Sequence, residues 1–270
     1  MSALAANVDA GLAIVKRDLQ HALSYRLRFV AQLLGVFFSL TLFYYVSRLV
    51  RLGAFSSPDA YYAFAVVGLL ILQVLNSTLS TPPATLRQEL VAGTFERIVC
   101  SPFGAVGSVV AMMVFPFVYA LWTTLATLVV AGVVFGMHVE WATAPLAVPV
   151  AVLGALSFAP FGVMLLASVT LVKQAIAGTT WLIAGISLIA GFYFPVSLLP
   201  NWVEWASQVQ PFTPAVDLMR HLLVGTHLRE AAWLDLVKLA GFAAVLMPLS
   251  VYVLKLAVRA SRRRGTIIEY

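Results

Sequence analysis

The chain has 270 residues, of which 61% are hydrophobic and only 10% are charged. A soluble domain averages about 45–50% apolar and about 25% charged residues, so this composition excludes a soluble globular protein and indicates an integral membrane protein. The formal net charge of +6 does not indicate nucleic-acid binding, because the basic residues lie at segment ends without an interleaved aromatic face. The single cysteine, Cys100, excludes an intrachain disulfide, and it lacks the neighbours of a zinc site.

An amphipathic helix is expected over residues 7–24, ahead of the first membrane span. Apolar residues recur there at spacings of three and four: Val8, Leu12, Val15 and Leu19. Lys16 and Arg17 lie on other faces, and the segment carries too many charges to cross a membrane. We therefore expect an interface helix, with an ordinary solvated leader helix as the alternative.

Six apolar segments are long enough to cross about 30 Å of hydrocarbon. They cover residues 29–52, 60–81, 104–136, 141–172, 175–194 and 231–258. With the N-terminus inside, twelve Lys and Arg residues lie on the inner side and five on the outer side. The positive-inside rule thus predicts that both termini are cytoplasmic, in a multi-pass protein of a prokaryotic plasma membrane. The chain 1–270 is expected to form one all-α transmembrane domain.

The second of these spans becomes polar in its second half. Polar residues recur there at steps of three and four, so they share one helix face: Gln73, Asn76, Ser77, Ser80 and Thr81. Side chains of this kind either join helices within a bundle or line a path for a transported compound. The fifth span adds Thr180 and Ser187 within a run of small residues, which permits close packing of helices.

A short polar stretch, residues 86–102, separates the second and third spans. It carries two acids and two bases, each of which is costly in hydrocarbon, so the stretch must project into water. We expect a helix that ends at Gly93, a new N-cap at Thr94 and a short helical turn over residues 95–98. Pro102 can open the next helix, since its missing N–H has no partner there.

The segment 195–224 is aromatic and apolar, yet it cannot form one continuous helix. Four prolines interrupt it: Pro195, Pro200, Pro211 and Pro214. We expect two short helices that dip into the outer leaflet, one over residues 200–208 and one that begins with Thr213 as its cap and Pro214 at its first position. Asp217 and Arg220, three residues apart, can then form a pair. An interfacial anchor without a gating role is the alternative.

The residues Arg87, Gly93, Thr94, Glu96, Ser101 and Pro102 resemble the cytoplasmic loop of the ABC-2 type transporter permeases, and the stretch 191–220 resembles the same family. The resemblance implies that residues 86–102 hold a coupling helix that docks on a separate ATP-hydrolysing subunit. The docking residues would be Arg87, Gly93, Thr94, Phe95, Glu96, Arg97 and Ile98. It also implies that the outer helices close the exit of the transport path, with Phe194, Pro195, Pro200, Pro211 and Arg220 shaping this gate. Gln73, Asn76, Ser77, Thr180 and Ser187 would face the cargo.

The sequence lacks a Gly-x-x-x-x-Gly-Lys-[Ser/Thr] loop, so the chain is not expected to bind nucleotide or to be catalytic alone. No cofactor or metal is expected in this chain, and ATP and Mg would be bound by the partner subunit. The favoured function is the permease subunit of an ATP-driven exporter of a lipophilic or amphipathic compound. Alternatives are a permease for a polysaccharide or lipid-linked glycan, an ion-coupled secondary transporter, and a non-transporting scaffold. One unit is too small for a wide conduit, so a homodimer or a heterodimer with a sister permease is expected.

Overall fold

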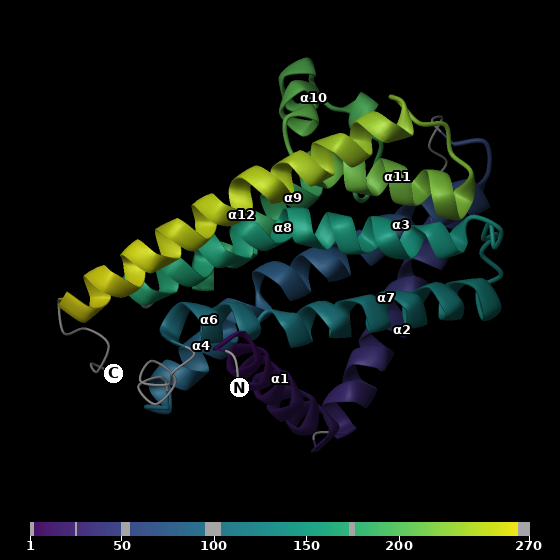
Figure 1. Cartoon of the computed structure of the whole chain (residues 1–270). Helices are drawn as coiled ribbons and strands as arrows, with labels where there is room; N and C mark the ends of the chain where they lie inside the picture. Colours follow the sequence, from purple (N-terminus) through teal and green to yellow (C-terminus); the bar gives the residue numbers. More distant parts are fainter. Residues whose placement is uncertain (1–2, 25, 50–54, 95–103, 173–175, 264–270) are drawn as a thin grey trace.

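A computed structural model of the chain shows long helices that run side by side (Figure 1). It describes residues 3–24, 26–49, 55–94, 104–172 and 176–263, and within these ranges it contains helices and turns but no strand. The helices are α1 (Ala3–Ser24), α2 (Arg26–Leu49), α3 (Pro58–Leu79), α4 (Thr81–Val91), α6 (Gly104–Ala111), α7 (Val114–Val133), α8 (Ala144–Val172), α9 (Ile176–Ile189), α10 (Asn201–Gln208), α11 (Phe212–Val224) and α12 (Ala232–Arg263). A single 3-10 turn, η1 (Val196–Leu198), precedes α10. The predicted all-α fold class is confirmed.

Five segments of the described chain are long and apolar enough to cross a membrane. They are Val30–Leu49, Pro58–Val91, Gly107–Val133, Ala144–Leu171 and Ala232–Ser261. The expected fifth span is absent from this set, because α9 has only 14 residues. At 1.5 Å per residue such a helix measures about 21 Å, shorter than the hydrocarbon core. The chain is a multi-pass membrane protein, while the count of six spans stays a prediction.

The start of α3 follows the expected chemistry. Ser57 is its N-cap and accepts a hydrogen bond of 3.1 Å from the backbone N–H of Ala60, and Pro58 opens the helix. Pro82 and Pro83 interrupt the helix only slightly, because both lie in the first turn of α4, where their missing N–H groups have no intrahelical partner. The two helices thus form one long path from Pro58 to Val91.

The predicted third span is divided in two. Its helices α6 and α7 are separated by a turn at Met112 and Met113, and Pro116 lies in the first turn of α7. The sequence predicts a kink near Pro116, which has no N–H to donate to the carbonyl of Met112, four residues earlier. The turn at Met112 and Met113 confirms this prediction.

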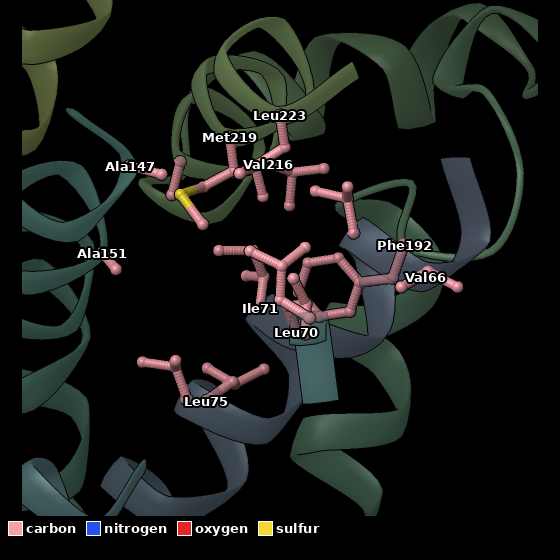
Figure 2. Close-up of a cluster of buried hydrophobic side chains, with 14 of the residues drawn as sticks. Val66, Leu70, Ile71, Leu75, Ala147, Ala151, Phe192, Val216, Met219 and Leu223 are labelled. Atoms are coloured by element: carbon pink, nitrogen blue, oxygen red, sulfur yellow. The ribbon is translucent and has the colours of Figure 1, made fainter. Parts of the chain in front are cut away.

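The main apolar core surrounds α3. Figure 2 shows Leu70, Ile71 and Leu75 of α3 facing side chains of α8 and α11, with Phe192 beside them. A second, smaller core lies where α4, α6, α8 and α12 meet, and its most buried residues are Leu86, Val109, Leu166 and Leu254. The larger core thus holds α3 in the bundle, and the smaller core holds α4.

Candidate functional site

Residues 86–94 are the described part of the predicted coupling region. One side of this part packs against the bundle, and the other side is exposed. Leu86 of α4 is fully buried in the smaller core. Arg87 and Gln88, the next two residues, are exposed, and Val91 is 61% exposed. An exposed valine near an exposed arginine is typical of a surface that binds another protein.

Gly93 ends α4 as predicted. Its φ is +68°, in the left-handed region that favours glycine. The N–H of Gly93 donates to the carbonyl of Leu90 at 3.2 Å, and the N–H of Thr94 donates to the carbonyl of Glu89 at 3.1 Å. These two bonds form a Schellman motif, which satisfies carbonyls that the helix end leaves open.

The Thr94 side chain points back toward α4. Its hydroxyl donates to the backbone carbonyl of Glu89 at 3.2 Å and also to the Glu89 carboxylate. The N–H groups that Thr94 is predicted to cap belong to residues 95–98. Phe95, Glu96, Arg97 and Ile98 all lie outside the described residues.

Glu89 also joins α4 to the interface helix α1. One oxygen of its carboxylate lies 3.0 Å from a guanidinium nitrogen of Arg17, which pairs with Asp18 at 2.9 Å as well. Both carboxylates are largely covered, with 17% and 15% of the side chain exposed, whereas Arg17 is 45% exposed. No pattern in the sequence indicates this link, because Arg17 and Glu89 are far apart in the chain.

The predicted cargo-path residues divide into two groups. Gln73 of α3 exchanges hydrogen bonds of 3.1 and 3.2 Å with Thr127 of α7, and Ser187 is buried, with its hydroxyl on the carbonyl of Ala184. These two side chains therefore have polar partners within the described chain. Asn76 and Thr180 are exposed, and Asn76 bonds only to a carbonyl of its own helix, that of Leu72.

On α3 these residues form a stripe, which we define as Gln73, Asn76, Ser77 and Ser80. Asn76 is exposed on a helix that is otherwise largely buried beyond its first turn, and its stripe neighbours are half-buried. One chain thus leaves a polar strip of its central helix partly uncovered.

At the opposite end, the two short helices expected in the outer segment are present as α10 and α11. The prediction that Thr213 caps α11 was wrong. The helix begins two residues earlier than predicted, at Phe212, and the Thr213 hydroxyl is instead 3.3 Å from the side-chain amide of Gln210. Among the predicted gate residues, Pro211 and Arg220 are buried, Phe194 and Pro195 are half-buried and Pro200 is exposed. Whether the helices re-enter the membrane stays a prediction.

The predicted pair of Asp217 and Arg220 does not form. The Asp217 carboxylate lies 3.7 Å from Arg229, and Arg220 turns to backbone carbonyls of other segments. Burial raises the pKa of Asp217, while the charges of Arg229 and Arg220 oppose that shift. Burial also lowers the pKa of Arg220, to about 9, which leaves the guanidinium protonated at neutral pH.

The comparison with protein families agrees with the fold. The model of a family described as ABC-2 family transporter protein matches residues 47–252, well over half of the chain. No curated protein matches the chain. The match includes α3, α4 and the outer helices α10 and α11, the elements that carry the candidate surfaces. The chain belongs to the ABC-2 family of transporter proteins, and it is therefore a membrane permease subunit of the ABC transporter type.

Proposed function

We propose that the chain is the permease of an ATP-driven exporter whose ATP is hydrolysed by a separate subunit. The observation that carries this proposal is the exposed end of α4. Its core residue Leu86 is buried, while Arg87, Gln88 and Val91 are free for contact, so a force on this surface would pass directly into α3. The partner would bind ATP and Mg, and this chain would supply the coupling surface, continued by residues 95–98.

The charge distribution supports a cytoplasmic position for this surface. Figure 1 shows α4 and α6 at the same end of the bundle as the C-terminal end of α12. Lys255, Arg259 and Arg263 of α12 lie at this end, and the sequence continues the basic run with Arg264. An excess of Lys and Arg near the ends of membrane spans favours the inner side of a membrane, whether or not acids pair with them. We therefore place α4 and both termini in the cytoplasm of a prokaryotic cell.

The partly uncovered stripe of α3 supports a transport path shared by two copies. An amide side chain such as that of Asn76 is unfavourable against lipid, so it needs a polar neighbour or a water-filled cavity. Thr180, Trp181 and Ala184 of α9 are exposed as well. A second copy of the chain, or a sister permease, would cover these surfaces and enclose the path. The mainly apolar walls favour a lipophilic or amphipathic cargo, taken from the cytoplasm or the inner leaflet.

The test is co-purification and ATP hydrolysis with a candidate ATPase subunit. Arg87→Glu should weaken the complex by at least about tenfold, because reversing a charge in an interface places like charges together. Arg48→Glu, at the opposite end of the bundle, is the matched control and should leave the complex intact.

Two results would contradict this function. One is the failure of the wild-type chain to bind an ATPase subunit or to stimulate its activity with cargo. The other is transport that stops when the proton gradient is collapsed while ATP is preserved, since this indicates an ion-coupled carrier.

A further inference from the structure

The turn that ends α9, formed by Gly191 and Phe192, is held between α3 and α11. It is a second Schellman motif: the N–H of Gly191 donates to Leu188, the N–H of Phe192 donates to Ser187, and Gly191 has a φ of +72°. The Phe192 side chain is fully buried in the core beside Val66 and Leu70 (Figure 2). We call this turn the outer turn.

The first contact of the outer turn is with α3 at Gly68. A Cβ atom on Gly68 would lie 1.9 Å from the carbonyl oxygen of Phe192, closer than any side chain permits. The backbone of the outer turn therefore rests directly on α3, and only glycine allows this approach.

The second contact comes from Arg220 of α11. Its Nη2 atom lies within hydrogen-bond distance of three backbone carbonyls, Gly191 at 2.9 Å, Phe192 at 3.1 Å and Phe64 of α3 at 3.3 Å, which share its two N–H groups. The guanidinium carbon lies 3.3 Å from the centre of the Phe64 ring, a cation–π contact. Arg220 is 4% exposed, so one cation connects α3, the outer turn and α11 inside the protein.

Burial of the Arg220 guanidinium is unfavourable in free energy, and its contacts must offset this. Its Nε–H is buried and has no hydrogen-bond partner among the residues that the structure describes. A buried, unpaired donor is unfavourable, and the charge has no carboxylate within ion-pair distance among the described residues. The guanidinium is thus placed to hold carbonyls at the negative end of α9 rather than to complete its own hydrogen bonds.

We propose that Arg220 is a positioning residue for transport: with Gly68 it locks the outer turn to α3 and α11, so that these three elements move as one body. The exit then opens in the segment that follows, residues 194–200, and Arg220 is an anchor of the gate rather than a part that moves. This inference rests on the proposed function for its role in transport, but the joint itself is a property of the chain alone.

Amide hydrogen exchange on the chain in lipid nanodiscs tests the joint. Arg220→Gln and Gly68→Ala act on the Phe192 carbonyl from two directions, and both should speed exchange of residues 188–194 by at least about tenfold, the effect of losing one charged hydrogen bond. Arg220→Lys, which keeps the charge and three donors, should restore most of the protection. Arg48→Gln and Gly35→Ala, which has no atom within 4 Å of an added Cβ, are matched controls and should not change this exchange.

The turn at Gly93 is an internal reference, because it has the same motif and no described arginine donates to its backbone carbonyls. A selective change at residues 188–194, with residues 88–94 unchanged, supports the joint. Unchanged exchange in both Arg220→Gln and Gly68→Ala overturns it. The joint is also overturned if every helix of the Arg220→Gln variant loses protection and Arg220→Lys does not restore it, because that result indicates general unfolding.

Transport by the complex with the ATPase subunit tests the second half of the inference. Arg220→Gln should lower cargo export by at least about tenfold, and Arg220→Lys should retain more activity than Arg220→Gln. Export at the wild-type rate in Arg220→Gln would overturn the role in the exit. If the wild-type chain binds no ATPase subunit, the proposed function fails, while the exchange result still decides whether the joint exists.

Discussion

Gly93 is the residue whose backbone decides where α4 stops and the predicted coupling region begins. An added Cβ at this position meets no atom within 4 Å, so the need for glycine comes only from its φ of +68°. Gly93→Ala should therefore lower the free energy of unfolding by about 1–2 kcal/mol, the cost of the left-handed conformation for an L-residue. Thermal or denaturant unfolding in detergent measures this. Gly241→Ala in α12, which also has free space but an ordinary helical φ, is the control and should show no loss.

The Arg17–Glu89 pair is the other feature that a single substitution can test. Arg17 is 45% exposed, so the pair contributes only about 0.2–1 kcal/mol to folding. Its larger role is to hold α1 against α4. Arg17→Gln and Glu89→Gln should each reduce ATP hydrolysis coupled to cargo, and the double variant should be no worse than either single variant. A double-mutant cycle measures this coupling, and strictly additive losses would show that the two residues act separately.

At the scale of the element, α3 combines a structural and a transport role on one stripe. Gln73→Leu removes the hydrogen bonds to Thr127 of α7, so stability should fall by about 0.6 kcal/mol, the average for a side-chain bond between membrane helices. Asn76→Leu should leave stability unchanged, because its amide bonds only to its own helix, but it should alter transport or the choice of cargo. Unfolding in detergent and export from vesicles separate the two effects. If Asn76→Leu and the wild type transport cargo equally, the stripe does not line the transport path.

The elements were predictable from sequence where a local rule decides them. Ser57 and Pro58 start α3, Gly93 ends α4, and long apolar runs mark five candidate spans, since each depends on neighbouring residues alone. The break between α6 and α7 was predictable in the same way, because Pro116 has no N–H to donate to the carbonyl of Met112.

The partners of charged residues could not be predicted in the same way. Asp217 and Arg220 have the spacing of a helical pair, yet Arg220 binds carbonyls of Phe64 and Phe192, which are distant in sequence. Glu89 likewise meets Arg17 of another helix. Such contacts depend on how the helices pack, which spacing within one helix does not encode.

For the whole molecule, one end carries the proposed surface for an ATPase subunit and the other carries the predicted gate. The bundle between them is continuous from α4 through α3 to the outer turn. A movement of α4 would therefore reach the exit through a single helical path. This layout agrees with a permease that has no ATP site of its own and responds to a separate ATPase subunit.

The most direct measurement of this account is the accessibility of a cysteine at Gln88, an exposed residue of α4, in a chain whose only native cysteine is replaced by Cys100→Ser. A membrane-impermeant thiol reagent should label Gln88→Cys from the cytoplasmic side only, and binding of the ATPase subunit should protect it. His227→Cys, exposed near the outer end, should be labelled from the opposite side and stay accessible in the complex. Labelling of Gln88→Cys from outside, or labelling that the ATPase subunit does not change, would contradict the account.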